Sequence, residues 1–111
     1  MRKDDLIRLR HMLDAAREAD AFSQHKTRSS LDTDRKLVLA LVKCIEIIGE
    51  AAAKISTESR EELHQIPWLN IIGMRNRLIH AYFDINLDIL WKTIKEDLPP
   101  LISELERISK K

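Results

Sequence analysis

Glycine, proline, cysteine and aromatic residues are all scarce in this chain of 111 residues. With 2 glycines and 3 prolines beside 44% apolar and 33% charged residues, the composition suits a helical globular protein and argues against disorder. The single cysteine, Cys44, excludes an internal disulfide and fits a reducing compartment. Its setting, "LVKCIEII", favours a small buried hydrophobe over a reactive thiol.

Long apolar runs are also missing. No stretch of eighteen or more apolar residues is present, so we expect no membrane-spanning segment. The first residues, "MRKDDLIRLRHML", are charged throughout and lack the apolar region of a secretory signal. We therefore expect a cytoplasmic protein.

The charge of the chain is almost balanced, with 19 basic and 18 acidic residues and a formal net charge of +1. Proteins that hold nucleic acid by diffuse electrostatics usually carry a larger basic excess. A role on nucleic acid would therefore depend on a local basic cluster or on a site assembled from more than one chain.

Apolar residues recur at helical spacing through most of the chain, and no stretch alternates with period two. The pattern predicts helices over residues 4–22, 35–55, about 67 to 80 or 82, and 87–108. Pro99 and Pro100 should interrupt or kink the last of these, because proline removes a backbone donor and clashes with the preceding turn. The prediction is one all-α domain over residues 1–111, a bundle of four or five helices.

Helix starts can be predicted from residues that cap the first turn. Asp32 or Thr33 should begin the second long helix. The stretch "SREE", Ser59 to Glu62, has the form of a capping box and should open a short helical turn. Asp84 and Asn86 are candidate caps for the last helical segment.

The stretch "GMRNRLIHAYFD", residues 73–84, gathers polar and titratable side chains between apolar positions. On a helix, Asn76 and His80 would share one face, whereas Arg75 and His80 would diverge by about 140°. Histidine can donate or accept a proton near neutral pH, and an arginine fork matches two phosphate oxygens. These residues could support metal-free cleavage of RNA, in which the 2′-hydroxyl is the nucleophile.

The same residues also have a purely structural interpretation. Arginine and histidine in the last turn of a helix interact favourably with the helix dipole and often do nothing else. From composition alone, this structural interpretation is the favoured one.

A wider resemblance to a known family favours the catalytic interpretation over the structural one. "RNRLIHAY" resembles the Arg-x4-His-x-Tyr motif of HepT-like proteins, a branch of the HEPN ribonuclease superfamily. The blocks "IEIIGEAAAKIS" (45–56), "IPWLNIIGMRNRLIHAYFDIN" (66–86) and "LWKTIKEDLPPL" (90–101) resemble family blocks in the same order and spacing. The resemblance covers most of the chain from Ile45 onward and implies a HEPN-type up-and-down helical bundle.

The resemblance implies a toxin that is a metal-independent endoribonuclease and is neutralised by a MntA-type nucleotidyltransferase antitoxin. It implies Arg75 and His80 as catalytic residues, Asn76 as a supporting polar group, and Tyr82 as the site of adenylylation. It also implies a homodimer, in which two copies of Arg75, Arg77 and His80 would concentrate positive charge on the RNA. The alternative is a non-catalytic HEPN module that binds a nucleotidyltransferase or a nucleotide.

Glu50, in the family-like "IGEA" block, is a further supporting candidate that could orient a motif side chain through an ion pair. Glu46, Glu50 and Lys54 are spaced four apart, however, and that spacing is typical of pairing along a solvated helix face. We favour the solvated face. His11, His25 and His64 are scattered without a second ligand at metal spacing, so neither a metal site nor a cofactor is expected.

Overall fold

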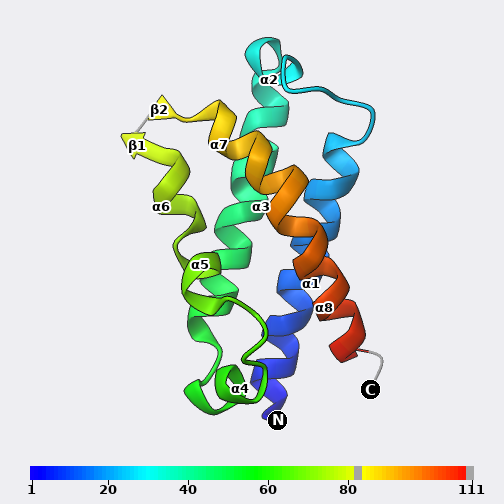
Figure 1. Cartoon of the computed structure of the whole chain (residues 1–111), viewed down its shortest axis with the longest axis vertical. Helices are drawn as coiled ribbons and strands as arrows, with labels where there is room; N and C mark the ends of the chain where they lie inside the picture. Colours follow the sequence, from blue (N-terminus) through cyan, green and yellow to red (C-terminus); the bar gives the residue numbers. More distant parts are fainter. Residues whose placement is uncertain (82–83, 110–111) are drawn as a thin grey trace.

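The computed structural model describes residues 1–81 and 84–109, and most of that part of the chain is helical (Figure 1). The elements in chain order are α1 (Lys3–Ser23), α2 (Ser30–Thr33), α3 (Arg35–Lys54), α4 (Thr57–Glu62), α5 (Trp68–Ile72), α6 (Met74–Leu78), β1 (Ile79–Ala81), β2 (Asp84–Ile85), α7 (Leu87–Lys92), the π-helical turn η1 (Thr93–Asp97) and α8 (Leu98–Ser109). The predicted all-α bundle is confirmed, with one short hairpin added. Among the described residues, no helix is both long and apolar enough to cross a membrane.

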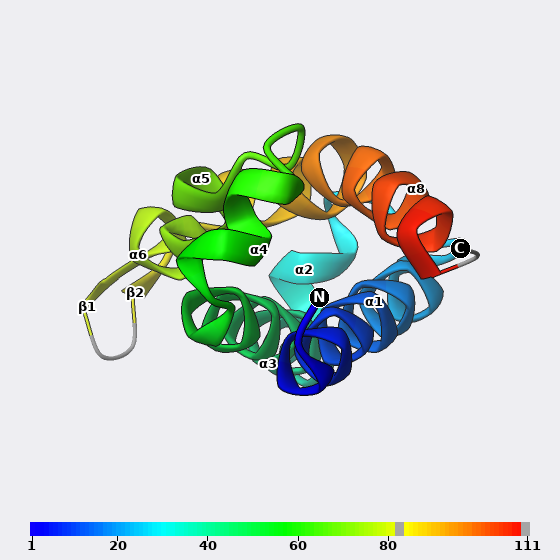
Figure 2. The ribbon, with the colours of Figure 1, turned by 90° about the horizontal axis from the view of Figure 1, so that it is seen from below.

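The long helices α1 and α3 form an antiparallel pair along one side of the bundle (Figure 2). Helix α8 lies against α1, and α5 and α6 lie against α3, as Figure 1 and the end-on view in Figure 2 both show. Buried residues of α3 recur every three or four positions, which is the spacing of one helix face. The same face carries Cys44, which is 4% exposed, so its prediction as a buried hydrophobe is confirmed. Burial raises the pKa of the Cys44 thiol to about 11, with a smaller contribution from the charge of Glu18.

Helices α3 and α7 each begin after a side chain that caps their first turn. The Asp34 carboxylate accepts a hydrogen bond from the backbone N–H of Leu37 at 3.0 Å, and the Asn86 side chain accepts one from the third residue after it at 3.0 Å. The predicted cap at Asn86 is confirmed. The long helix, however, begins after Asp34, because Asp32 and Thr33 belong to the separate short helix α2.

The capping box predicted at Ser59–Glu62 is wrong. Helix α4 begins two residues earlier, and its cap is Ser56, whose Oγ accepts a hydrogen bond from the Ser59 N–H at 3.2 Å. Ser59 itself lies inside the helix and is 2% exposed. Its hydroxyl donates to Asp5 at 2.7 Å, so a buried partner on α1 explains its position better than a capping role.

The two consecutive prolines do not break the last helical segment. Pro99 and Pro100 lie in the first turn of α8, where a missing N–H costs least in a new helix. The helical hydrogen bonding changes just before the prolines, in η1, where the Leu98 N–H donates to the carbonyl of Thr93 five residues earlier. The Thr93 hydroxyl donates to the Ile89 carbonyl at 2.8 Å. The predicted interruption therefore takes the form of a π-helical turn.

The helix predicted from about residue 67 to 80 or 82 is shorter than expected. It is divided at Gly73 into α5 and α6, and it ends at Leu78. The prediction that His80 lies on this helix is wrong, because its backbone belongs to strand β1. The following stretch, "IHAYFDI", is rich in β-branched and aromatic residues, which favour extended structure.

Strands β1 and β2 form an antiparallel hairpin after α6. Ile79 pairs with Ile85, and the register shifts between Ile79 and Ala81. Both isoleucines are half-buried against the core, and the Asn86 N–H donates to the Leu78 carbonyl at 2.7 Å. These contacts fix where the hairpin leaves the bundle and where α7 begins.

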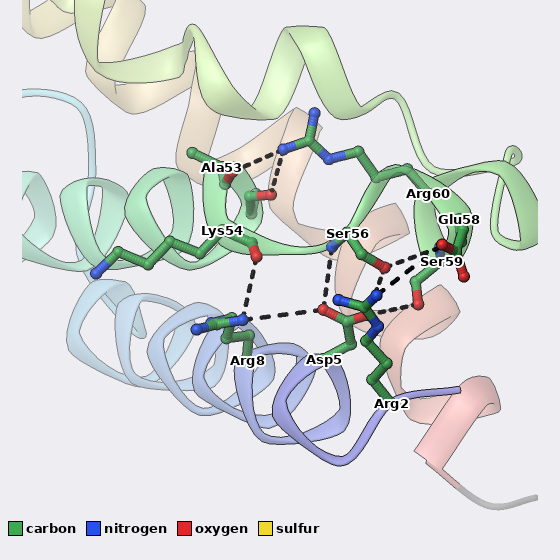
Figure 3. Close-up of polar contacts among 10 residues, drawn as sticks. Arg2, Asp5, Arg8, Ala53, Lys54, Ser56, Glu58, Ser59 and Arg60 are labelled. Atoms are coloured by element: carbon green, nitrogen blue, oxygen red, sulfur yellow. Dashed lines mark hydrogen bonds and ion pairs between the residues drawn. The ribbon is translucent and has the colours of Figure 1, made fainter.

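A buried carboxylate joins the start of α1 to the connection between α3 and α4 (Figure 3). Asp5 is 1% exposed and accepts three hydrogen bonds: from the Ser56 N–H at 3.0 Å, the Ser56 hydroxyl at 2.6 Å and the Ser59 hydroxyl at 2.7 Å. The two hydroxyl bonds, Ser56 first, lower the pKa of Asp5 to about 2 against the opposing effect of burial.

Two arginines beside this cluster satisfy carbonyl groups at the end of α3 (Figure 3). Arg8 of α1 donates to the Lys54 carbonyl at 3.1 Å, and Arg60 of α4 donates to the Ala52 and Ala53 carbonyls at 3.1 and 2.8 Å. The last carbonyls of a helix have no partner within it, so these contacts cap α3 from two other elements.

Asp5→Asn is expected to lower the melting temperature at pH 7 and to change the acid dependence of stability. Because the pKa of Asp5 is lower in the folded chain than in the unfolded one, its contribution is present above the unfolded value of 3.8 and is lost as the pH falls toward about 2. Thermal unfolding followed by circular dichroism between pH 7 and 2 measures it. The difference in melting temperature between wild type and Asp5→Asn should disappear as the pH falls from 3.8 to about 2.

The matched control is Asp4→Asn, which removes the neighbouring exposed carboxylate. It should leave the melting temperature close to that of the wild type. An equal loss in both variants, or a gap that persists at pH 2, would contradict the role given to Asp5.

Candidate active site

The Arg-x4-His-x-Tyr motif starts on α6 and continues into the hairpin. Arg75 and Asn76 are exposed on α6. The backbone of His80 lies in β1, and its side chain lies outside the described part of the molecule, as does Tyr82. Because His80 is not on the helix, the predicted shared face with Asn76 and the divergence of about 140° from Arg75 do not apply.

Arg75 points toward the long helix α3. Its Nε donates to Oε1 of Glu46 at 3.3 Å, which joins two residues 29 positions apart. The Arg75 side chain is 51% exposed and that of Glu46 is 25% exposed. The guanidinium is thus tethered at one nitrogen while much of it faces solvent, where an anionic group can reach it.

The carboxylate that meets Arg75 is therefore Glu46, whereas the sequence pointed to Glu50. Glu50 lies one turn further along α3 and is exposed. It lines a groove of about 360 Å³ between α3 and α1, with His11 and Arg8 among the other lining residues. Glu50 and Lys54 are exposed, as the solvated-face prediction expects, whereas Glu46 is 25% exposed and contacts Arg75. Sequence spacing does not predict this contact. Charged residues spaced four apart occur both on solvated helix faces and on faces that contact another helix.

Arg77 points away from Arg75. Two residues apart on a helix, they differ by about 200° in direction. Arg77 Nη1 donates to the backbone carbonyl of Asn70 in the middle of α5 at 2.9 Å. It also lines a cavity of about 240 Å³ between α6 and the η1–α8 segment, beside Glu96 and Asp97. Within one chain, Arg75 and Arg77 therefore do not form a single basic cluster.

The short helices that carry the motif are anchored by buried apolar residues. Trp68 is 8% exposed, and its Nε1 donates to the Leu63 carbonyl at 3.1 Å. Met74 and Leu78 of α6 are 3% and 0% exposed. Arg75 and Asn76 project from a helix whose opposite face is fixed in the core.

Gly49 allows α3 and α5 to come close beside the motif. A Cβ atom at this position would lie 3.6 Å from the carbonyl oxygens of both Ile71 and Ile72. This is ordinary van der Waals contact for one methyl group. Gly49 therefore has a packing role where α3 meets the end of α5.

The start of α7, just after the hairpin, is held by an arginine far away in the sequence. Arg28 Nε donates to Asp88 at 2.6 Å, across 60 positions, and its Nη1 donates to Asp32 at 3.0 Å. The hydrogen bond to Asp88, and then that to Asp32, raise the pKa of Arg28. This contact had no sequence signal, and it fixes the loop before α2 against the segment that follows the motif.

Metal-ligating side chains are scattered in the part of the chain that the structure describes. No group of three or more His, Cys, Asp or Glu residues there lies close enough to hold a metal ion.

His25 adopts a positive φ of 61° in the loop between α1 and α2, a conformation in which histidine is enriched.

Comparison with known proteins assigns the family. The model of a family described as "Ribonuclease HepT-like" matches residues 12–108. The chain belongs to the HepT-like ribonuclease family. The match includes α6, the hairpin and Glu46, and so the whole motif and the partner of Arg75.

Curated relatives agree with this assignment. The chain is 42% identical over 77 residues to "Probable ribonuclease HepT" of Thermococcus cleftensis, covering 69% of this chain and 70% of that protein. It is 37% identical over 108 residues to "Gamma-glutamylcyclotransferase and putative RNase" of Methanocaldococcus jannaschii. That alignment covers 97% of this chain but only 49% of the relative, so the chain spans about half the length of that protein. No solved structure matches the chain.

Proposed function

We propose that this chain is a metal-independent endoribonuclease and the toxin of a two-component system whose antitoxin is a MntA-type nucleotidyltransferase. The observation that carries the proposal is the intact sequence Arg75-x4-His80-x-Tyr82 in a chain that belongs to the HepT-like ribonuclease family. Arg75 on α6 is half-exposed, so its guanidinium is accessible to an RNA phosphate, as the proposal requires.

The proposed reaction uses the 2′-hydroxyl of RNA as the nucleophile. The 2′-oxygen attacks the adjacent phosphorus and loses its proton, the bond from phosphorus to the 5′-oxygen breaks, and that oxygen gains a proton. The products are a 2′,3′-cyclic phosphate and a 5′-hydroxyl. His80 acts as general acid or base, and Arg75 stabilises the charge that builds on the phosphate oxygens. Asn76, Arg77 and Glu50 are proposed only as supporting residues.

The proposed control is covalent. The nucleotidyltransferase transfers AMP from ATP to the phenol oxygen of Tyr82, and pyrophosphate leaves. A phosphodiester and an adenosine then lie two residues from His80 in the sequence, where the new negative charge would repel the RNA backbone. The modification thus acts on the same site that carries the chemistry.

The proposed active form is a homodimer with two-fold symmetry. One chain has a net charge of +1, and its Arg75 and Arg77 point in different directions. A second protomer is therefore the simplest source of further positive charge beside Arg75. A two-fold interface is also the commonest way in which identical chains associate.

Light scattering on the purified protein should give twice the chain mass of 12.9 kDa. Specific activity should fall when the protein is diluted until the dimer dissociates, because each site would lose groups supplied by the other protomer. A monomer that keeps full activity at low concentration would contradict the dimer proposal.

The direct test of the proposed activity is incubation of the purified protein with RNA in the presence of a chelator. Cleavage should proceed. Failure to cleave any RNA, with the protein folded and dimeric, would instead favour the non-catalytic binding module.

A further inference from the structure

Glu46 is the one carboxylate that contacts a motif side chain within the described residues. Its Oε1 lies 3.3 Å from Arg75 Nε. The neighbouring positions Ile45 and Ile48 are each 0% exposed, so this part of α3 is fixed in the core. Arg75, by contrast, lies on a helix of only five residues. The long helix therefore offers a rigid partner to a side chain on a short element.

The contact uses the guanidinium in a particular way. It engages Nε, whereas the two terminal nitrogens make no hydrogen bond to any described residue. A hydrogen bond at Nε restricts rotation of the guanidinium and leaves its two terminal nitrogens available to another acceptor. That arrangement matches the paired oxygens of a phosphate, which a flexible or differently rotated arginine would meet less often.

The contact is poorly explained as a stabilising ion pair. The Arg75 side chain is 51% exposed and the separation is long for a charge-assisted hydrogen bond. Exposed pairs of this kind contribute little to folding. Glu46 also places a negative charge beside the arginine that would receive an RNA phosphate, which opposes binding of the substrate in its ground state.

We propose that Glu46 is a positioning residue for Arg75: it orients the guanidinium for the transition state at some expense to RNA binding. The proposal rests on the proposed ribonuclease function. It adds that Arg75 acts by stabilising the transition state and not simply by attracting RNA.

The proposal gives a distinct kinetic signature. Glu46→Ala removes both the charge and the hydrogen-bond acceptor, so kcat should fall by about 10- to 100-fold, the usual result when a group that orients a reactive residue is lost. KM should stay unchanged or decrease, because a negative charge beside the phosphate site has gone. Glu46→Gln keeps an acceptor oxygen and should recover part of the lost kcat.

The control is Glu62→Gln, which removes an exposed carboxylate at the end of α4 without a contact to the motif. It should keep the wild-type kcat and KM. Melting temperatures of all three variants should lie close to that of the wild type. A Glu46→Ala protein with unchanged kcat would overturn the positioning role, as would one whose activity is lost only through unfolding.

A second measurement does not depend on activity. In nitrogen–proton correlation spectra, the Arg75 Nε–H signal of the wild type should be shifted relative to those of arginines without a carboxylate partner, and Glu46→Ala should abolish the shift. Identical Arg75 signals in the two proteins would overturn the contact itself. If the spectra differ as expected but the wild type cleaves no RNA, the proposed function fails and the positioning role in catalysis fails with it, while the ion pair remains.

Discussion

His80→Ala is expected to lower the rate of RNA cleavage by about 10²- to 10⁴-fold, the contribution typical of a general acid or base. Arg75→Ala should lower it by about 10²- to 10³-fold, the usual cost of removing one group that stabilises transition-state charge. The two effects should not add fully in the double variant, because both residues act on the same phosphate. Initial rates on a labelled RNA measure all three proteins.

The folded state should survive both substitutions. Arg75 is half-exposed and its ion pair with Glu46 lies at the surface, so its removal takes little from the core. Arg75→Lys should recover only part of the activity, since an ammonium group keeps the charge but not the planar fork. Circular dichroism and thermal unfolding check that lost activity is not lost structure.

Arg10→Ala is the matched control for Arg75→Ala. Arg10 is an exposed arginine on α1 that pairs with Asp14 at 3.0 Å, so its loss removes one positive charge and one surface ion pair elsewhere. It should leave cleavage unchanged. If Arg10→Ala lowers the rate as much as Arg75→Ala, general electrostatic attraction accounts for the effect; a fully active His80→Ala would remove histidine from the mechanism.

Tyr82→Phe is expected to abolish adenylylation while leaving the nuclease active. The substitution removes only the phenol oxygen, which is the acceptor of AMP in the proposed control. Intact mass spectrometry after incubation with ATP and the nucleotidyltransferase should show addition of AMP to the wild type and none to Tyr82→Phe. Cells that carry both proteins should then be protected from the wild-type toxin but not from the variant.

The reason for silencing can be tested on the modified protein itself. AMP brings a negative charge and a bulky adenosine, so it should weaken RNA binding most at low salt, where electrostatic repulsion is least screened. Filter binding of RNA to the modified and unmodified proteins measures this. A Tyr82→Phe protein that is still modified and silenced to the wild-type extent would show that another residue is the switch.

The main helices could be predicted from the sequence because their apolar spacing is local. Residues 4–22 and 35–55 were expected to be helical, and α1 and α3 span Lys3–Ser23 and Arg35–Lys54. The hairpin was missed because Leu78 and Ile79 continue the helical pattern of the preceding residues. The end of α6 depends instead on the pairing of Ile79 with Ile85 and on the Asn86 contact to Leu78, which connect residues not adjacent in the sequence.

The site was predicted at the level of the motif but not of its contacts. Family resemblance singles out Arg75, whereas its partner Glu46 lies 29 positions away and could not be chosen over Glu50 by spacing. Similarly, the family resemblance implied a homodimer in which Arg75, Arg77 and His80 concentrate positive charge, and only the structure shows Arg77 turned back to Asn70. Contacts between distant elements depend on how helices pack, which single-sequence periodicity does not contain.

The central claim is that the RNA 2′-hydroxyl, and not a metal-bound water, attacks the phosphate. The most direct test is cleavage of two oligonucleotides in the presence of a chelator, one all-ribose and one with a single 2′-deoxy nucleotide at the cleaved position. The wild-type protein should cut the first to a 2′,3′-cyclic phosphate and a 5′-hydroxyl and leave the second intact at that position. Equal cleavage of both oligonucleotides, or activity that disappears with the chelator and returns with added metal, would contradict the account.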